Sequence, residues 1–372
     1  MGGQTIHSFF RIKPGKIDIK KIKADYRKDL FNEIDTLIID EVSMVRSDLM
    51  HAIDVSLRLN RDRPDEPFGG VQMVFVGDLY QLPPVMRNDE RNYIIETYGG
   101  EQFYDAPVFK TYGYHFIELT HIFRQSEEEI VFKNLLNNIR INETTEEDIS
   151  LLNSRHKSRV GLNPSATFLT SMRKTASNIN QNKLDKLISK EHIFTGKLSG
   201  KYAKLVDQGE EYLDNKLPAP YKLKLKEGAH VMMLKNDSGF RWVNGSVGVI
   251  TKIDKRDIFV QIEGTEHLVE PEEWREVKFE LNKDSEKIEE KTAAEFIQYP
   301  MQLAYAITIH KSQGKTFDNI IIDVGYGAFA HGQVYVALSR CRSLEGVILN
   351  TPIHRKDIIV NMRVAEYYKR MG

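Results

Sequence analysis

The stretch TLIID, residues 36–40, decides the fold class of this chain. It is a short apolar run that ends in a carboxylate, and VQMVFVGD, residues 71–78, repeats the pattern. Such runs are typical of buried parallel strands whose carboxyl ends open onto a functional site. Between them, RSDLMHAIDVSLRLN has helical apolar spacing, with Ser47 or Asp48 as the expected cap. Strand, helix and strand in this order predict an α/β fold with a parallel sheet and crossover connections.

A second alternation of helices and strands follows in the C-terminal part of the chain. The expected helices are SEEEIVFKNLLNNIR (126–140), KTASNINQNKLDKLIS (174–189) and GQVYVALSRCRS (332–343). The expected strands are ATFLTS (166–171), NIIIDV (319–324) and GVILN (346–350). The chain is therefore expected to contain two α/β units of the same class.

Residues 244–299 differ from both units. GSVGVITKID, DIFVQIEG and WREVKFEL are punctuated by glycine and rich in β-branched and aromatic residues, which predicts a small antiparallel barrel inserted in the second unit. The charged stretch NKDSEKIEEK, residues 282–291, is expected to be a solvated connector.

Composition excludes several classes of protein. Lys and Arg number 52 and Asp and Glu 53, so any polyanion site must be a local patch and not a property of the whole molecule. Cys341 is the single cysteine, which rules out an internal disulfide and suits a reducing compartment. No apolar run approaches the roughly 18 residues of a membrane span, so no membrane partner is expected.

A phosphate-binding loop of the form G-x-x-x-x-G-K-[ST] is not found in the 372 residues. Gly314, Lys315 and Thr316 supply its ending, but Ile309 stands where the first glycine is needed. The other two Gly-Lys pairs, at positions 15 and 196, are followed by isoleucine and leucine. The stretch HKSQGKT must therefore serve another purpose.

The strand ends carry the first candidate catalytic residues. In LIIDEVSMV, residues 37–45, Asp40 is placed to hold Mg²⁺ largely through water, and Glu41 to activate a hydrolytic water. In VGDLYQLPPV, residues 76–85, Gln81 suits the orientation of water or the sensing of a terminal phosphate. The alternatives are two solvated acids after a strand and a rigid turn with a solvent-facing amide.

Arginines supply the second half of the candidate catalytic set. Arg124, in ELTHIFRQ, lies where the first α/β unit meets the second, and Arg340, in VYVALSR, lies on a helix of the second unit. An arginine that reaches across a cleft can neutralise charge during phosphoryl transfer. Taken one at a time, each arginine is better interpreted as a member of a surface ion pair.

The order of these stretches resembles the petite-integration-frequency (PIF) helicases, RecD-like motors of superfamily 1B. GGQTIHSFF is similar to motif Ib, LIIDEVSMV to motif II, GDLYQLPPV to motif III and LTHIFRQ to motif IV. AYAITIHKSQGKTFDNIIID is similar to motif V and GQVYVALSRCRSLEGVIL to motif VI. The resemblance covers nearly the whole chain and rests on six motifs in family order.

The resemblance implies an ATP-dependent 5′ to 3′ DNA helicase with Mg²⁺ and ATP as cofactors, acting in replication, repair, recombination or telomere maintenance. The implied catalytic residues are Asp40, Glu41, Gln81, Arg124 and Arg340, which would also bind the nucleotide together with Gln313 and Gly314. The implied contacts to single-stranded DNA are Thr5, His7, Ser8, Phe9, Thr308, His310, Lys311 and Ser312, none of which is a typical reader of base edges. Phe9 could stack on a base or pack in the core.

The resemblance also implies a division into domains. Residues 1–122 correspond to the first RecA-like domain (1A), with a short 1B wedge at about 10–30. Residues 123–243 and 300–372 correspond to the second (2A), and 244–299 to an SH3-like barrel (2B). The phosphate loop and a strand beside the Asp40 strand are expected upstream of motif Ib, so the chain is expected to be an N-terminally truncated helicase that is inactive alone.

Two further hypotheses remain open from the sequence. The chain could be a non-catalytic remnant that binds single-stranded DNA, or the motor segment of a RecD-like recombination nuclease or conjugative relaxase. The expected partners are single-stranded and forked or partial-duplex DNA, with replication or repair proteins as further candidates, and a monomer is expected. The expected location is the nucleoid of a bacterial cytoplasm, or the nucleus or mitochondrion of a eukaryote.

Overall fold

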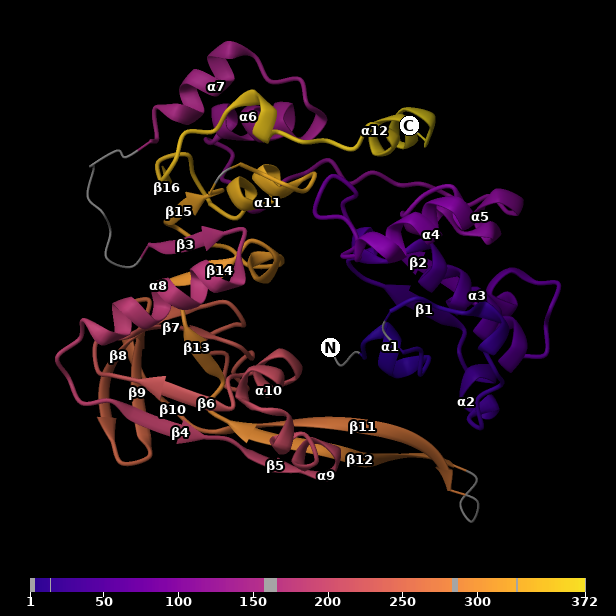
Figure 1. Cartoon of the computed structure of the whole chain (residues 1–372), viewed down its shortest axis with the longest axis horizontal. Coiled ribbons are helices and arrows are strands. Elements are labelled where there is room, and N and C mark those ends of the chain that lie inside the picture. Colours follow the sequence, from indigo (N-terminus) through magenta and orange to yellow (C-terminus); the bar gives the residue numbers. More distant parts are fainter. Residues whose placement is uncertain (1–3, 14, 157–165, 283–286, 326, 372) are drawn as a thin grey trace.

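The computed structural model describes residues 4–13, 15–156, 166–282, 287–325 and 327–371, without the side chains of residues 88, 211, 215 and 277–291. Gly2 and Gly3 of the expected motif Ib lie outside the described residues, as do residues 283–286 of the expected connector. We call residues 4–122 the N-terminal lobe. The C-terminal lobe is the four-stranded parallel sheet with its helices, and the barrel sheet is the five-stranded antiparallel sheet beside it (Figure 1).

The N-terminal lobe is built on two parallel strands. β1 (Thr36–Ile39) pairs with β2 (Gln72–Phe75), and α3 (Ser47–Asn60) forms the crossover between them. Arg46, and neither of the two expected residues, is the N-cap of α3, and it makes no side-chain cap hydrogen bond. Within the described residues neither strand has a further strand partner. The remaining elements of the lobe are α1 (Ile6–Phe9), η1 (Ile19–Lys21), α2 (Lys28–Asn32), η2 (Val42–Met44), η3 (Pro67–Gly70), α4 (Asn88–Tyr98), η4 (Phe103–Asp105) and α5 (Pro107–Thr111).

The C-terminal lobe contains a parallel sheet in the order β14, β3, β15, β16. These strands are β3 (Thr167–Thr170), β14 (Ala306–Thr308), β15 (Ile320–Asp323) and β16 (Val347–Leu349). The helices and turns of the lobe are α6 (Ile130–Ile141), α7 (Glu146–Asn153), α8 (Arg173–Asp185), η6 (His310–Ser312), α11 (Gln333–Ser339) and η7 (Arg355–Asp357). The prediction of an α/β fold with parallel sheets is confirmed.

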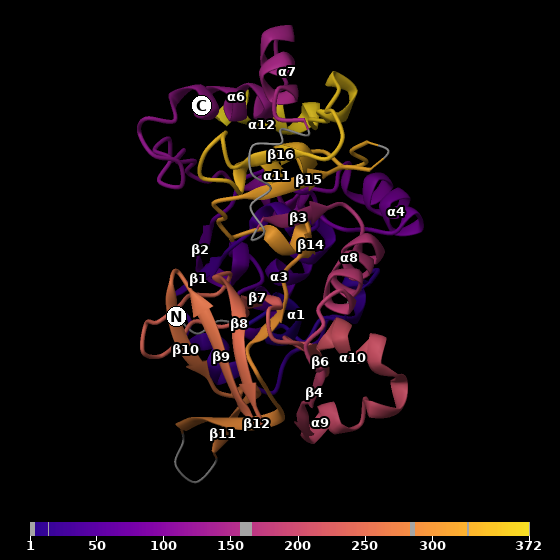
Figure 2. The ribbon, with the colours of Figure 1, turned by 90° about the vertical axis from the view of Figure 1, so that its left-hand side faces the viewer.

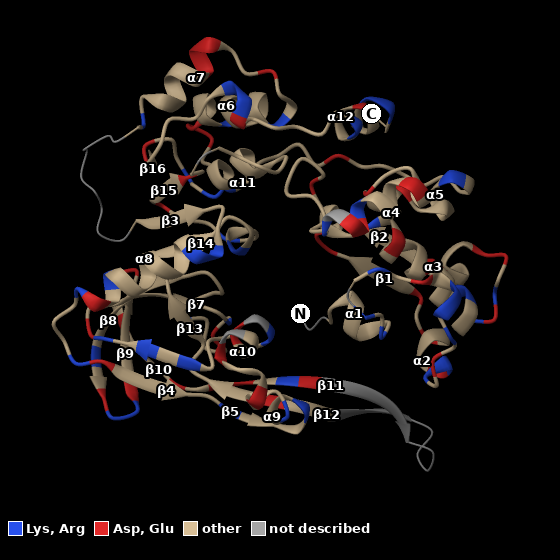
Figure 3. Ribbon diagram, in the orientation of Figure 1, with Lys and Arg blue, Asp and Glu red and all other residues tan. Residues whose placement is uncertain are grey.

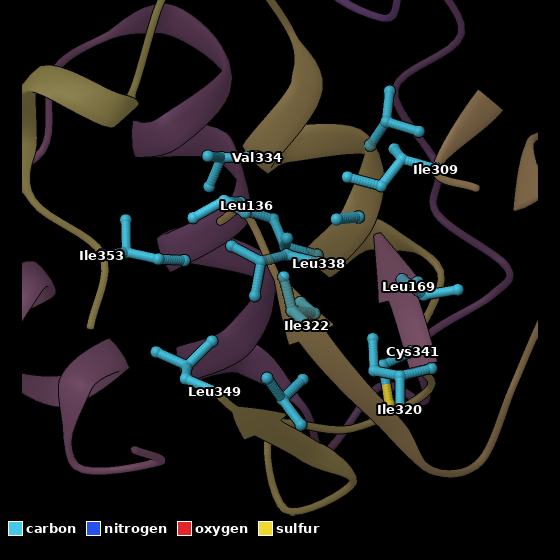
Figure 4. Packing of buried hydrophobic residues seen from close by; sticks show 14 of the residues in the cluster. Leu136, Leu169, Ile309, Ile320, Ile322, Val334, Leu338, Cys341, Leu349 and Ile353 are labelled. Atoms are coloured by element: carbon cyan, nitrogen blue, oxygen red, sulfur yellow. The ribbon is translucent and has the colours of Figure 1, made fainter. Parts of the chain in front are cut away.

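Helices α6 and α11 cover the parallel sheet of the C-terminal lobe and form its hydrophobic core. Leu136 of α6 and Val334 and Leu338 of α11 pack with Ile322 and Leu169 of the strands (Figure 4). All five are buried. Burial on this scale favours the lobe by roughly 1.5–3 kcal/mol per side chain before the loss of conformational entropy is counted.

The barrel sheet has the order β10, β9, β8, β7, β13, with antiparallel pairing throughout. Its strands are β7 (His230–Met233), β8 (Val247–Asp254), β9 (Asp257–Ile262), β10 (Thr265–Val269) and β13 (Met301–Leu303). β7 and β13 lie outside the interval 244–299 that the sequence suggested. Figure 2 shows β8, β9 and β10 side by side in this sheet.

A long hairpin replaces most of the expected solvated connector. β11 (Glu272–Asn282) pairs with β12 (Lys287–Gln298), and the register continues to Asn282 opposite Lys287. The prediction of a connector over 282–291 is therefore wrong for residue 282 and for residues 287–291, because their backbone is paired in a ladder. β12 of the hairpin also pairs with β5 (Lys197–Ser199), and β4 (His192–Thr195) pairs with β6 (Lys222–Leu225). The short helices of this region are α9 (Gly200–Ala203), η5 (Val206–Gln208) and α10 (Glu210–Lys216).

The last helix, α12 (Met362–Met371), returns to the N-terminal lobe. Figure 1 shows it at the end of an extended connection that leads from the C-terminal lobe towards the N-terminal lobe. Val364 and Tyr367 are buried in the same core as Phe103 and Val108. The lobes are thus joined both by the chain near residue 122 and by its C-terminal helix.

Acidic and basic residues are interspersed over both lobes (Figure 3). No helix in the described part of the chain is long and apolar enough to cross a membrane.

Candidate nucleotide and DNA-binding sites

Asp40 and Glu41 follow the carboxyl end of β1. Glu41 has a left-handed backbone with φ of 50°, which ends the strand and turns the chain into η2. Asp40 is exposed, and its Oδ1 accepts a hydrogen bond of 2.8 Å from the Glu41 backbone N–H. One carboxylate therefore faces solvent while the other is half-buried.

The loop 77–81 follows β2 and lies against the same strand end. A Cβ added to Gly77 would stand 2.9 Å from the Val42 backbone nitrogen, so only glycine allows this approach. The Asp78 carboxylate accepts hydrogen bonds from the Tyr80 backbone N–H at 3.0 Å and from Gln81 Nε2 at 3.3 Å. Gln81 is therefore held by a neighbouring acid and does not swing freely in solvent.

Both candidate arginines are held by residues of the C-terminal lobe. Arg124 Nε donates to the Thr316 hydroxyl at 3.1 Å, and its Nη1 donates to the Ser339 carbonyl at 3.0 Å. Arg340 is 2% exposed; its Nε donates to the Val336 carbonyl and its Nη2 to the Ser339 hydroxyl. Neither arginine has an ion-pair partner among the described residues.

Electrostatics place the acids and the arginines in one cluster. Burial and the Asp40 carboxylate raise the pKa of Glu41, while Arg340 and Arg124 oppose that rise. Burial and the neighbouring Arg124 lower the pKa of Arg340 to about 10. Glu41 of the N-terminal lobe is thus close enough to Arg124 and Arg340 for their charges to interact, and we call the space between them the crevice.

A cleft of about 720 Å³ borders this crevice. Gly77 and Asp78 line it from the N-terminal lobe, and Arg124, Tyr335 and Ser339 line it from the C-terminal side. Its volume is within the range of ordinary ligand sites.

The candidate DNA contacts of motif Ib lie on and beside α1. Thr5 is exposed and its hydroxyl caps α1 by accepting from the Ser8 N–H. His7 is half-buried, and burial with Arg46 nearby lowers its pKa. The Phe9 ring packs edge-on against Phe10 at 4.9 Å between ring centroids. Phe9 keeps part of its surface, whereas Phe10 is buried.

The candidate contacts of motif V lie in and around η6 and divide into two groups. Thr308 and Ser312 are buried: the Thr308 hydroxyl accepts from the Lys311 N–H, and the Ser312 hydroxyl donates to the Ile309 carbonyl at 2.7 Å. His310 is half-buried and Lys311 exposed. Partial burial and Arg173 lower the pKa of both. Figure 3 shows basic residues both at the start of α8 and in this turn.

The end of motif V contacts other parts of the chain. Gly314 has φ of 71° and open space where a Cβ would stand. Gln313 Nε2 is buried with no hydrogen-bond partner in the described part of the chain. Lys315 Nζ donates to Asn244 Oδ1 at 2.9 Å, next to the barrel sheet. Lys315 thus contacts the region beside the barrel sheet, and Thr316 contacts Arg124.

Sequence reasoning missed three residues that build the site. Asp78, at the end of the second apolar run, holds Gln81, and its position after a strand was the available signal. Tyr335 lies beside Asp78, whose charge together with burial raises the Tyr335 pKa. Gly332 stands where a Cβ would lie 2.3 Å from the Tyr80 carbonyl oxygen, and no local pattern announces that contact.

Comparison with known proteins shows to which family this chain is related. The PIF1-like helicase family matches residues 1–149, and the UvrD-like helicase C-terminal domain matches residues 303–348. The ATP-dependent DNA helicase Pif1 of Bdellovibrio bacteriovorus is 32% identical over 100% of this chain and 79% of its own length. The chain belongs to the PIF1-like helicase family.

Other PIF1-like relatives agree with this assignment. Human ATP-dependent DNA helicase PIF1 is 31% identical over 93% of this chain, which spans about half (51%) of the human protein. A crystal structure of Bacteroides sp Pif1 in complex with ADP-AlF4 has a TM-score of 0.85 and 36% identity over 98% of this chain and 83% of that one. Bacteroides Pif1 bound to single-stranded DNA has a TM-score of 0.71 and 37% identity over 99% and 84%. The RecA-like α/β fold expected from the resemblance is confirmed.

Glu41→Gln is expected to stabilise this PIF1-like protein at neutral pH. Because burial and Asp40 raise the Glu41 pKa above its ordinary value of 4.5, folding favours the neutral carboxyl. Stability from this group is fully present below pH 4.5 and is lost as pH rises through the raised pKa. The melting temperature of the variant should exceed that of wild type at pH 7.5, and the difference should shrink towards pH 4.5. Exposed Glu128→Gln, which also removes one charge, should show no such trend.

Gly332→Ala is expected to destabilise the contact between the lobes. The left-handed backbone alone costs about 1–2 kcal/mol for alanine, and the clash with the Tyr80 and Gln81 carbonyls adds to that cost. Gly99→Ala is the matched control, since Gly99 has φ of 82° and nothing within 4 Å of its added Cβ. Thermal melting should show a larger loss for Gly332→Ala; equal losses would contradict the backbone contact.

Proposed function

We propose that the crevice between the lobes is the ATP site of a 5′ to 3′ DNA helicase motor. The observation that carries the proposal is the cleft of about 720 Å³, which Gly77 and Asp78 line from one lobe and Arg124 and Ser339 from the other side. The interaction of Glu41 with Arg124 and Arg340 agrees with it. A site divided between two RecA-like units changes when the units move, so hydrolysis there can drive movement along DNA. The Bacteroides relative, described in complex with ADP-AlF4 and, separately, with single-stranded DNA, supports both halves of the proposal.

The proposed roles follow from the chemistry of each side chain. Glu41 accepts the proton of the attacking water, for which its raised pKa is suited. Gln81, held by Asp78, orients that water, and Arg124 and Arg340 neutralise charge that develops on the phosphates. The buried, unpartnered Gln313 amide and the open turn at Gly314 face the nucleotide.

Asp40 fits Mg²⁺, because it is an exposed carboxylate whose second oxygen is free for a hydrated cation. The described residues contain no group of three or more His, Cys, Asp or Glu side chains that could hold a metal alone. Mg²⁺ would therefore be shared with phosphate oxygens and water, and when bound it would neutralise phosphate charge. Since the 372 residues contain no phosphate loop, we expect this chain to bind ATP weakly.

The proposed DNA track joins α1 to the turn after β14. Thr5, His7, Phe9, His310 and Lys311 present surface for the strand, whereas Thr308 and Ser312 hold the turn in shape through internal hydrogen bonds. We propose that the track also takes forked or partial-duplex DNA, that the protein acts as a monomer, and that it works with DNA in the nucleoid or the organelle of its host. The domain limits 1–122, 123–243 with 300–372, and 244–299 are part of the same proposal, the last extended by β7 and β13.

A second candidate function is binding of single-stranded DNA without hydrolysis. The observation that favours it is that the 372 residues contain no phosphate loop of the form G-x-x-x-x-G-K-[ST]. Membership of the PIF1-like family makes the recombination-nuclease and relaxase readings less favoured.

Binding of a fluorescent single strand by this chain should weaken steeply with salt. Lys311→Ala should reduce the slope of log K against log salt by about one, because one phosphate contact is lost. Lys356→Ala removes an exposed lysine of η7, outside the track, and should leave the slope unchanged. Anisotropy titrations over a range of salt concentrations measure both, and equal slopes for the three proteins would contradict the track.

ATP-driven strand displacement by the protein expressed from its whole gene tests the motor. Glu41→Gln should lower unwinding and DNA-stimulated hydrolysis by about 10²-fold or more while single-strand affinity is retained. The 372-residue chain should hydrolyse ATP at the background rate. Unwinding that survives Glu41→Gln would disprove the assignment of the crevice, and rapid hydrolysis by the 372-residue chain would disprove the need for a phosphate loop.

A further inference from the structure

Helix α12 is part of the N-terminal lobe in space although it ends the C-terminal lobe in sequence. Val364 and Tyr367 are 1% and 4% exposed and pack in the N-terminal core. Ile353 and Ile358, a short distance earlier in the chain, belong instead to the core of the C-terminal lobe. Figure 1 shows the connection crossing from one lobe to the other. The segment is therefore a strap between the lobes.

The strap is fastened firmly to the N-terminal lobe. Arg363 Nη1 donates to the Gly99 carbonyl at 2.8 Å, and its Nη2 contacts Asp105 Oδ1 at 2.7 Å. The Tyr367 ring stacks on Tyr104 with centroids 4.2 Å apart, and the Tyr114 hydroxyl donates to the Tyr367 hydroxyl at 2.8 Å. None of these contacts touches the nucleotide crevice.

Tyr368, the next residue, contacts the 77–81 loop. Its ring stacks on Tyr80 at 4.7 Å between centroids, with an angle of 15° between the ring planes. The Leu79 backbone N–H donates to its hydroxyl at 3.4 Å. Burial and the Asp78 carboxylate raise the pKa of Tyr368 to about 12, so the hydroxyl stays neutral and can accept this bond. Tyr368 also lines the 720 Å³ cleft.

The loop also has contacts from the C-terminal lobe. The Arg140 guanidinium of α6 lies 5.2 Å from the centre of the Tyr80 ring. Gly332, before α11, lies against the Tyr80 and Gln81 carbonyls. These contacts cross between the lobes and are lost when the lobes separate, whereas the contact with Tyr368 stays within the N-terminal lobe.

We propose that α12 is a strap that holds the 77–81 loop in position, with Tyr368 as the positioning residue for Gln81. The inference deepens the proposed function and rests on it, since Gln81 orients water only if the crevice hydrolyses ATP. With the lobes apart, Tyr368 keeps the loop in its working geometry; with the lobes closed, Arg140 and Gly332 add the second support. ATP hydrolysis can therefore begin each time the lobes close, because the 77–81 loop already holds Gln81 in its working conformation.

Tyr368→Leu and Tyr367→Leu in the protein expressed from its whole gene form the matched test. Both remove an aromatic ring from the same helix, but only Tyr368 touches the loop. Tyr368→Leu should lower kcat for DNA-stimulated ATP hydrolysis by about tenfold with little change in KM for ATP, because misplacement of a positioned group acts on the chemical step. Tyr367→Leu should lower the melting temperature at least as much and leave kcat near wild type. Tyr368→Phe, which keeps the ring, should restore most of the rate.

Equal kcat losses in the two leucine variants at matched thermal stability, or no loss in Tyr368→Leu, would overturn the proposal. Hydrogen–deuterium exchange of the 372-residue chain separates it from the proposed function, because exchange needs no ATP hydrolysis. Amides of residues 77–82 should exchange faster in Tyr368→Leu and not in Tyr367→Leu. If the wild-type protein expressed from its whole gene hydrolyses no ATP, the motor fails while this exchange difference still establishes the strap; unchanged exchange rejects the strap itself.

Discussion

The contact between Gly332 and the carbonyls of Tyr80 and Gln81 is the constraint on which the functional geometry depends. A Cβ at position 332 would lie 2.3 Å and 2.6 Å from those two oxygens, so the two backbones can touch only through glycine. Gly332 precedes α11, and Arg340 ends it. The contact of Gly332 with the loop after β2 therefore fixes one end of α11, and the position of Arg340 at the other end follows from it.

The charges in the crevice are poorly matched in the absence of a further ligand. The shift of Arg340 and the shift of Glu41 both favour the uncharged form, which shows that burial outweighs their attraction for each other. A multivalent anion close to Arg124 and Arg340 would favour the charged arginines, and a cation near Asp40 would favour the charged acids. A nucleotide triphosphate with its divalent cation supplies both, so the electrostatics and the proposed substrate agree.

Local patterns predicted the elements well and the contacts between distant segments poorly. The helices α3, α6, α8 and α11 and the strands β1, β2, β3, β15 and β16 lie within or across the predicted stretches, because apolar period and strand length are written locally. The register of β11 with β12 was not predictable, since a run of charged residues reads as solvated whether or not its backbone is paired. The packing of α12 on the N-terminal lobe and the contact of Gly332 with the 77–81 loop depend on tertiary structure. The periodicity of apolar residues in the sequence does not predict them.

The candidate site divides in the same way. Asp40, Glu41 and Gln81 became candidates because polar residues that follow short apolar runs are informative by themselves. The prediction that these two strands are buried is wrong for most of their residues, since only Ile39 of β1 is buried and β2 has no buried residue. The assignment of roles to Arg124 and Arg340 needed the order of six motifs. Thr308 and Ser312 show the limit of that transfer: a motif gives residue types in order, but burial decides which hydroxyls can meet a ligand, and both are spent on internal bonds.

The turn after β14 shows why a failed phosphate loop can still be central to a motor. Over a few residues it presents Lys311 to the proposed DNA track, Lys315 to Asn244 beside the barrel sheet, and Thr316 to Arg124 at the cleft. The Ser312 hydroxyl bonded to Ile309 and the Thr308 hydroxyl bonded to the Lys311 N–H make that turn one stiff piece. A DNA strand that contacted Lys311 would therefore act on the same turn that supplies Thr316, the hydrogen-bond partner of Arg124. Coupling between DNA and nucleotide therefore needs no long pathway here, only a turn whose successive side chains point to different partners.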